Sequence, residues 1–255
     1  MCLILVAWQS HPRFPLVVAA NRDEFHHRPS RAAGPWPDVP GVLGGLDLEA
    51  GGTWLAVAQP GRLAAVTNVR EPGAPKGRRS RGCLPRDFLL GGQSPAAFAA
   101  QVDGAAHSGF NLLLADRDAL WYCSNRSGPP VPLGPGIYGV SNHLLDTPWP
   151  KLVSAKARFA QALAGLPGFA PLFDLLADRE IVPDHALPGT GVPLEWERML
   201  SAVFVDSEAY GTRASTVLTW APGEGFVMEE RSFGPGGAPL GTVRLSGPPG
   251  VPASR

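Results

Sequence analysis

The chain has 255 residues, a length that suits one large α/β or α+β domain, and it carries 22 basic and 22 acidic residues. A formal net charge of zero argues against a broad surface for nucleic acid or another polyanion. Charged residues make up 17% and hydrophobic residues 44%, so the composition predicts one compact domain with a sizeable core over residues 1–255.

Neither a membrane protein nor a disulfide-rich protein is indicated. The longest apolar runs, LILVAW and PLVVAA, are far shorter than the roughly 20 residues that cross a bilayer, so no membrane span is expected. No basic stretch precedes the first run, which argues against a signal peptide. Three scattered cysteines without a C-x-x-C pair predict neither a zinc ribbon nor a disulfide framework, and they favour a cytoplasmic location.

The first predicted element is an antiparallel hairpin. CLILVAW (2–8) and PLVVAA (15–20) have the composition of buried strands, and the segment between them contains the turn residue Pro12. In a hairpin centred there, residue i faces roughly residue 24−i. That register brings Cys2 opposite Arg22, with Asn21 and Asp23 beside it.

The Met1-Cys2 opening suggests a nucleophile. Removal of Met1 would leave Cys2 with a thiol and a free α-amine, whose ordinary pKa of about 8 suits a base near neutral pH. Such a residue is a nucleophile with its own base. Arg22 would favour the thiolate, and Asp23 would orient the ammonium. Alternatively, Cys2 fills the core and Arg22-Asp23 is an ordinary turn pair.

A second hairpin is predicted at TWLAVAQPGRLAAVTN (53–68), in which a Pro-Gly turn joins two strands and the second strand ends at Asn68. The loop VREPGAPKGRRSRG (69–82) follows, and its second half carries the cations Lys76, Arg78, Arg79 and Arg81. This loop is either an anion clamp over a site or a solvated surface loop.

The remaining elements alternate between helices and hairpins. Helices are predicted at 84–90, 94–102, 149–165 and 170–178, with a short one after 191. Strands are predicted at 110–116, 119–125 and 137–142, then at 215–220 after Arg213, and last at 226–233. An irregular Pro/Gly-rich tail is expected after residue 233. Because the strands follow one another in hairpins, the sheets should be mostly antiparallel.

Six motifs in order resemble the NRDE family, which is the family of transport and Golgi organisation protein 2. They are Met1-Cys2, NRDE at 21–24, TNVRE at 67–71, SRG at 80–82, SNHLLDTPWPK at 141–151 and YGTRASTVL at 210–218. That family is in turn similar to the N-terminal-nucleophile hydrolases of the penicillin V acylase and bile salt hydrolase group. The resemblance implies an α+β fold, a four-layer αββα sandwich.

The resemblance also implies a set of site residues. Carried over by position, the catalytic set is Cys2, Arg22, Asp23, Asn68, Asn142 and Arg213, with Asn68 contributing to the oxyanion hole. The acylases space their Arg and Asp further apart, whereas Arg22 and Asp23 are adjacent. Adjacent side chains on a strand point to opposite faces, so which of the tetrad faces Cys2 stays open. For both asparagines, turn capping is the alternative.

Two functions are compatible with these residues. One is a cysteine hydrolase that cleaves a linear amide bond of a small molecule and needs no cofactor. The other, implied by the family resemblance, is binding and trafficking of haem or an acyl ligand, with Asn21, Arg22, Glu24 and Arg213 as ligand-binding residues. A third interpretation is a protein that keeps this fold without catalytic activity, with Cys2 buried in its core. No metal site is expected, because adjacent His26 and His27 lack a partner pair.

Overall fold

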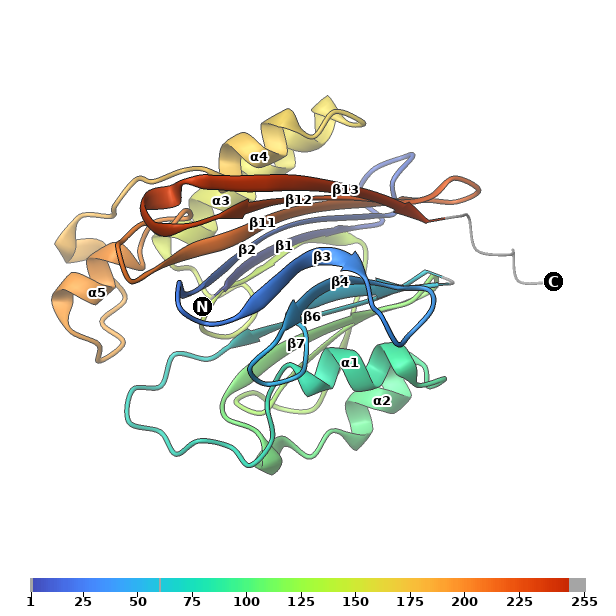
Figure 1. The fold of residues 1–255 in the computed structure, drawn as a ribbon, viewed down its shortest axis with the longest axis horizontal. Coiled ribbons are helices and arrows are strands. Elements are labelled where there is room, and N and C mark those ends of the chain that lie inside the picture. The colour runs from blue at the N-terminus through green and yellow to red at the C-terminus, as the bar shows by residue number, and fades with distance from the viewer. Residues whose placement is uncertain (1, 60, 248–255) are drawn as a thin grey trace.

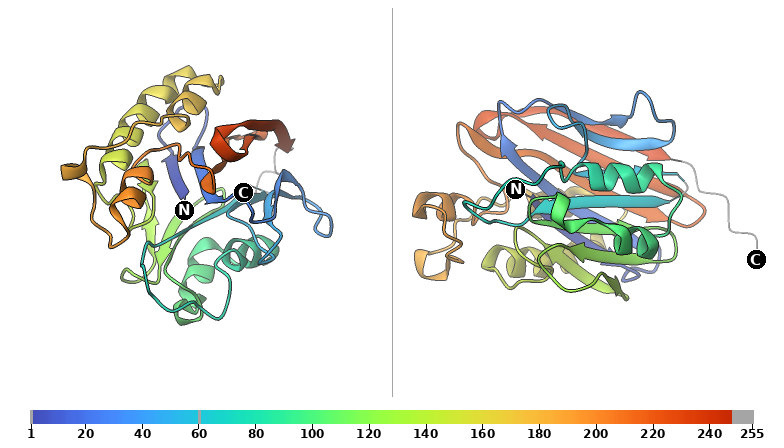
Figure 2. Two further views of the ribbon diagram at one scale, coloured as in Figure 1. Left: turned by 60° about the vertical axis from the view of Figure 1, so that its left-hand side comes forward. Right: turned by 90° about the horizontal axis from the view of Figure 1, so that it is seen from below.

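Two antiparallel sheets form the centre of the computed structural model, which describes residues 2–59 and 61–247. Sheet A has six strands in the order β10-β1-β2-β11-β12-β13, and sheet B has seven in the order β3-β4-β5-β6-β7-β8-β9. The two sheets lie face to face, with helices on both outer sides (Figures 1 and 2).

Sheet A combines strands from the first 25 residues with strands from residues 210–247. Its strands are β1 (Cys2–Trp8), β2 (Leu16–Phe25), β10 (Gly136–Val140), β11 (Tyr210–Ala221), β12 (Gly225–Phe233) and β13 (Pro239–Gly247). β1 pairs with β2 in the predicted register, with Cys2 opposite Arg22. On its other side β2 pairs with β11, so the late YGTRASTVL motif lies beside the early NRDE tetrad.

Sheet B is built from the middle of the chain. Its strands are β3 (Ser30–Pro35), β4 (Val42–Asp47), β5 (Leu55–Ala58), β6 (Arg62–Asn68), β7 (Phe110–Ala115), β8 (Leu120–Ser124) and β9 (Val131–Leu133). β5 and β6 are the predicted 53–68 hairpin, and they pair in antiparallel register. The end of β6 places Asn68 at the margin of sheet B.

Helices form the two outer layers. α1 (Cys83–Leu90) and α2 (Pro95–Gln101) cover sheet B, and α3 (Pro150–Ala162) and α4 (Ala170–Leu176) cover sheet A. Ser94 caps α2 by accepting a hydrogen bond from Ala97 N, with Pro95 at the first helical position. α5 (Leu194–Met199) projects at the end of the sandwich where β1 begins (Figure 1). This confirms the four-layer αββα sandwich.

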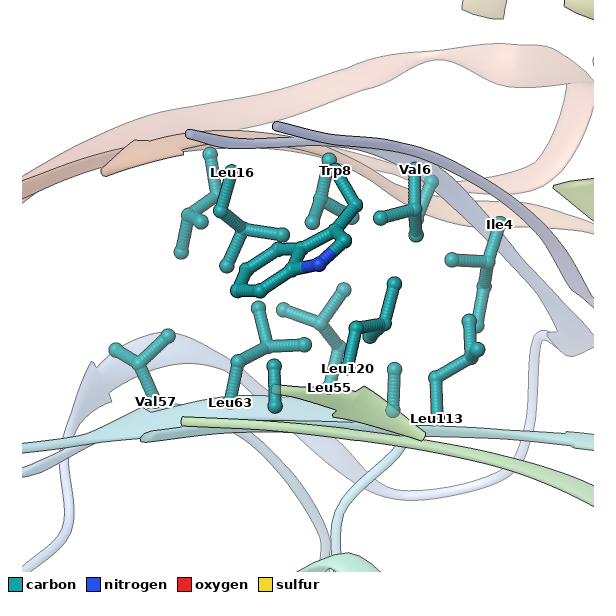
Figure 3. Close-up of a cluster of buried hydrophobic side chains, with 14 of the residues drawn as sticks. Ile4, Val6, Trp8, Leu16, Leu55, Val57, Leu63, Leu113 and Leu120 are labelled. Carbon is teal, nitrogen blue, oxygen red and sulfur yellow. The ribbon is translucent and has the colours of Figure 1, made fainter. Parts of the chain in front are cut away.

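Three apolar clusters hold the layers together. The central one lies between the sheets and contains Trp8 and Leu16 from sheet A and Leu63, Leu113 and Leu120 from sheet B (Figure 3). The other two lie under α3–α4 and under α1–α2. Successive residues of β1 alternate between these layers, as the period of a strand requires: Leu3 packs under the helices and Ile4 packs between the sheets.

Several strands were missing from the prediction. β3 and β4 consist largely of small and polar residues, including Gly44 and Gly45, so they lack the alternation that marks a strand. The expectation of an irregular tail after residue 233 was wrong for Pro239–Gly247, which forms β13. The last part of that tail, 248–255, lies outside the described residues.

Among the described residues, no helix is long and apolar enough to cross a membrane.

Candidate functional site

Cys2 opens onto a cleft of about 550 Å³ at the end of the sandwich. The cleft is lined from sheet A by Cys2, Asp23 and Glu24, and from sheet B by Thr67 and Asn68. The loop after β6 and the segment that carries α5 complete its walls. Met1, whose removal the sequence leads us to expect, lies outside the described residues.

Cys2 and Arg22 are cross-strand neighbours, so their side chains project to the same side of sheet A. That side faces sheet B, where the Arg22 guanidinium lies over the Trp54 ring, 4.4 Å from its centroid. Burial raises the pKa of the Cys2 thiol, and the positive charge of Arg22 opposes this shift. The thiol is therefore mainly protonated near neutral pH and needs a base to become a nucleophile.

Asp23 is a buried carboxylate that lines the same cleft as Cys2. Its Oδ1 accepts a hydrogen bond of 2.8 Å from Thr212 Oγ1, and its backbone carbonyl accepts one of 3.1 Å from the Tyr210 hydroxyl. Burial raises the pKa of the Asp23 carboxyl, while the positive charge of Lys151 and the Thr212 hydrogen bond lower it. Asp23 thus lies in a position to hold a cationic group next to Cys2.

Lys151 is a buried cation that the motif reasoning overlooked. It is the second residue of α3 and the last residue of the SNHLLDTPWPK motif, and its Nζ donates to Leu200 O over 2.8 Å. Burial lowers the pKa of Lys151 to about 8, and the negative charge of Asp23 acts against that shift. The signal available in the sequence was a lysine inside the quoted motif, at the start of an amphipathic helix.

Asn68 and Asn142 form a hydrogen-bonded pair. Asn142 is completely buried, and its Nδ2 donates to Asn68 Oδ1 over 2.9 Å. Because the Asn68 carbonyl oxygen accepts this bond, its amide nitrogen is left as the donor group for the cleft, where Asn68 is a wall residue. The Ser141 hydroxyl donates to Asn142 Oδ1, and the Arg70 backbone N–H donates to the Asn142 backbone carbonyl, which fixes Asn142 in place. Only Asn68 of the two reaches the cleft.

Arg213 lies at a β-bulge in the pairing of β11 with β2, where its side chain stabilises the neighbouring backbone. The pairing of β11 with β2 shifts register between Thr212 and Ala214, which leaves Arg213 as the extra residue. Its Nη1 donates to Phe25 O over 3.0 Å and to Arg28 O over 2.9 Å. Arg213 therefore closes the connection between β2 and β3, and it is not among the residues that line the cleft.

The remaining residues of the tetrad divide between the two faces of β2. Asn21 points toward the helical layer, where its Nδ2 donates to Leu176 O and Val203 O, and its Oδ1 accepts from Ser215. Asn21 thus supports the fold beneath the cleft. Glu24 lines the cleft, with Oε2 lying 3.8 Å from Arg22 and 3.7 Å from Arg28.

The basic loop 69–82 forms one wall of the cleft. The four cations Lys76, Arg78, Arg79 and Arg81 are all among its lining residues. Arg81 is the most buried of the four and donates to Gly109 O over 3.1 Å. Burial lowers the pKa of Arg81, and the negative charge of Glu24 opposes this shift. Arg81 thus fits the anion-clamp reading, whereas Lys76, Arg78 and Arg79 are exposed, as the solvated-loop reading expects.

An aromatic wall stands elsewhere in the cleft. Phe25, Trp196 and Tyr210 contact one another, with ring centroids 5.1 Å apart for Phe25–Tyr210 and 5.5 Å apart for Trp196–Tyr210. Trp196 is carried by α5, which sequence patterns identified only as a short helix. Within residues 2–59 and 61–247, no group of three or more His, Cys, Asp or Glu side chains is arranged to hold a metal ion.

Several known proteins are similar to this chain in sequence. The chain is 40% identical over 244 residues to the Transport and Golgi organization protein 2 homolog of Bos taurus, covering 86% of this chain and 88% of the relative. The Homo sapiens homolog is 38% identical over 243 residues, with the same coverage of 86% and 88%. The Drosophila melanogaster protein is 27% identical over 249 residues, covering 86% and 87%.

A solved structure shares the fold. The Caenorhabditis elegans N-acylethanolamine-hydrolyzing acid amidase (NAAA) ortholog superposes with a TM-score of 0.51 at 14% identity, covering 85% of this chain and 92% of that chain. This likeness confirms the N-terminal-nucleophile hydrolase fold and carries no more than the fold. The model of the family "Transport and Golgi organisation 2" matches residues 1–235, and the chain belongs to that family.

Proposed function

We propose that the protein is a cysteine amidohydrolase that cleaves a linear amide bond of a small molecule, with Cys2 as the nucleophile after removal of Met1. The observation that carries this proposal is the convergence of the Cys2 thiol, the Asp23 carboxylate and the Asn68 amide on one cleft. A nucleophile, an orienting acid and an oxyanion donor are the groups that acyl transfer needs.

The reaction follows from these groups. The α-amine of Cys2 takes the thiol proton, and the sulfur attacks the amide carbon to give a tetrahedral oxyanion. The Asn68 amide donates to that oxyanion, and the Asp23 carboxylate holds the new ammonium. The C–N bond then breaks, the amine leaves with the proton from the ammonium, and a thioester remains. Water, deprotonated by the α-amine, hydrolyses the thioester to the acid and restores the thiol.

The alternative function is binding and hand-over of haem or an acyl ligand without cleavage. The observation in its favour is the combination of the basic loop and the aromatic wall in the same cleft, which suits an amphipathic anion. Arg81 and Lys76 would hold carboxylate or phosphate groups, and Trp196 and Phe25 would contact the apolar part. The three free cysteines fit a reducing compartment such as the cytoplasm for either function.

A turnover assay separates the two functions. Mature protein would be incubated with a panel of N-acyl amides that differ in acyl chain and amine, and acid release would be followed by mass spectrometry. The proposal predicts turnover of part of the panel by the wild type and by Cys83→Ala, and loss of at least about 1,000-fold in Cys2→Ala. Saturable haem binding with no amide turned over would contradict the hydrolase and support the alternative.

A further inference from the structure

A second cavity lies behind Trp54, next to the Cys2 cleft. It has a volume of about 360 Å³ and is walled by β3 and by one end of β11, β12 and β13. Trp54 is common to the walls of both cavities. Arg22 and Arg213 line this second cavity, and neither is among the residues that line the Cys2 cleft. We call it the arginine cavity.

Arg22 is a buried cation that the protein leaves short of acceptors. Its side chain is only 5% exposed, and its Nη2 lies 3.8 Å from Glu24 and 3.9 Å from Asp47, too far for good hydrogen bonds. Its Nη1 is buried and has no acceptor among the described residues. Leaving a buried charged group short of close acceptors is costly, so an added anion beside Arg22 would be favourable.

Arg213 adds a second positive charge to the same cavity. Its guanidinium is fixed in place by the carbonyl oxygens of Phe25 and Arg28, which accept from Nη1 alone. Burial lowers the pKa of Arg213, and so does the positive charge of Arg22, which lines the same cavity. Two neighbouring guanidinium groups attract an anion, and their planar donors match a carboxylate.

Glu230 is the acidic residue that lines this cavity, and both of its carboxylate oxygens already accept hydrogen bonds from the protein. Its Oε1 accepts from Ala33 N over 2.6 Å, and its Oε2 accepts from Thr216 Oγ1 over 3.0 Å. Burial raises the pKa of Glu230, which lessens its repulsion of an incoming anion. The carboxylate of Glu230 therefore does not serve as a hydrogen-bonded partner of Arg22.

The rest of the wall is mixed, because Arg31 adds a third cation beside hydroxyl and apolar side chains. Phe233, Leu240 and Val243 line the arginine cavity together with small side chains and hydroxyl groups. The volume falls at the lower end of small-molecule sites, which suits a ligand with a short body. A charged end and an apolar remainder are the features of a small organic acid.

We propose that the arginine cavity binds a small monocarboxylate, with the carboxylate on Arg22 and Arg213 and the apolar body against Phe233, Leu240 and Val243. This site is separate from the Cys2 cleft and does not depend on amide cleavage. The ligand adds a counter-charge to Arg22, whose nearest carboxylates, Glu24 and Asp47, lie 3.8 Å and 3.9 Å away.

The probe for this proposal is 4-fluorophenylacetate, followed by ¹⁹F NMR on the full chain. We expect saturable binding to the wild type and equal binding to Cys2→Ala, so the result stands apart from any hydrolase activity. The neutral analogue 4-fluorophenylacetamide should bind about ten-fold more weakly or worse, because the guanidinium groups select for charge. Equal affinity for the acid and its amide, or no binding of the acid, would overturn the proposal.

Two substitutions test whether the probe binds in the arginine cavity. Arg22→Met keeps the stacking on Trp54 but removes the charge, and should weaken binding about ten-fold or more. Glu230→Gln removes the like charge and should strengthen binding. Unchanged affinity in both variants would contradict the assignment.

A pair of tryptophan variants gives an answer even if Arg22→Met does not fold. Val243 is paired with Glu230 and shares its face, whereas Arg244 is paired with Glu229 on the opposite face. Val243→Trp should fill the arginine cavity and abolish probe binding, while Arg244→Trp should leave it unchanged. Binding that survives Val243→Trp would place the ligand elsewhere and overturn the proposal.

Discussion

Asn68 and Asn142 have different roles, although the family resemblance names both as catalytic residues. Asn142 is completely buried and makes no contact with the cleft, but its amide donates to Asn68 Oδ1. This bond decides which end of the Asn68 side chain faces the substrate. Asn142 is therefore a positioning residue, and Asn68 is the group proposed to touch the oxyanion.

We predict that Asn68→Ala lowers kcat about 100- to 1,000-fold with little change in KM, because an oxyanion donor acts only in the transition state. Asn142→Ala should lower kcat less, by about 10-fold, because Asn68 stays present but rotates freely. The measurement is steady-state kinetics on the best amide of the panel. Unchanged kcat in Asn142→Ala, with Asn68→Ala impaired, would remove the positioning role.

Sequence motifs predicted the candidate site residues, but only the contacts in the structure show which of their side chains reach the cleft. The family resemblance named Asn21 as a ligand-binding residue, and in the structure Asn21 bonds to Leu176, Val203 and Ser215 under the helices. Arg213 lies at a β-bulge that no sequence pattern announces. Lys151 was overlooked because lysines are usually solvated, and its burial depends on contacts distant in sequence.

At the scale of elements, α5 is held against the sandwich by a buried ion pair. Arg70 follows β6, and its Nη1 lies 2.9 Å from Glu197 Oε2, with both side chains 4% exposed. Glu197 Oε1 also accepts from the backbone and the hydroxyl of Thr190. Because Glu197 is next to Trp196, this pair sets the position of the aromatic wall of the cleft.

We predict that Glu197→Gln lowers the free energy of unfolding by about 3–5 kcal/mol, because it leaves Arg70 buried without a counter-charge. Hydrogen exchange should accelerate in residues 188–200 before it does in the central sheets. The double variant Arg70→Met/Glu197→Leu is the matched control and should recover most of the loss. Exchange that accelerates uniformly over the whole chain would contradict a local anchoring role.

The predicted register of the first hairpin was confirmed residue by residue, since Cys2 pairs with Arg22. Two apolar strands and one proline turn leave little freedom in that pairing. β4 and β13 were not predictable in the same way, because Gly44, Gly45 and the Pro/Gly-rich tail resemble turns when read locally. β4 and β13 form because neighbouring strands, β5 and β12, pair with them through backbone hydrogen bonds.

At the scale of the whole molecule, the sandwich brings distant motifs to one end. The start of β1, the end of β6 and the α5 segment meet there, as do residues 69–82 (Figure 1). The layered fold was predictable from ordered motifs that resemble a known family. The arginine cavity was not, because it depends on β3 and β13, two strands without a clear pattern.

The central claim is that Cys2 becomes an N-terminal, reactive thiol. The most direct test is mass spectrometry of the intact protein and its N-terminal peptide, from the native host, after brief exposure to iodoacetamide at several pH values. Cys123 is an internal reference, because burial raises the pKa of its thiol to about 11.

The account predicts that Met1 is absent and that Cys2 is modified faster than Cys83 and Cys123. Because burial raises the pKa of Cys2, its thiolate fraction and its rate of modification should increase as the pH rises. Retention of Met1 would contradict the account, since the α-amine would then no longer belong to the residue that carries the thiol. Modification of Cys83 before Cys2 would contradict it as well.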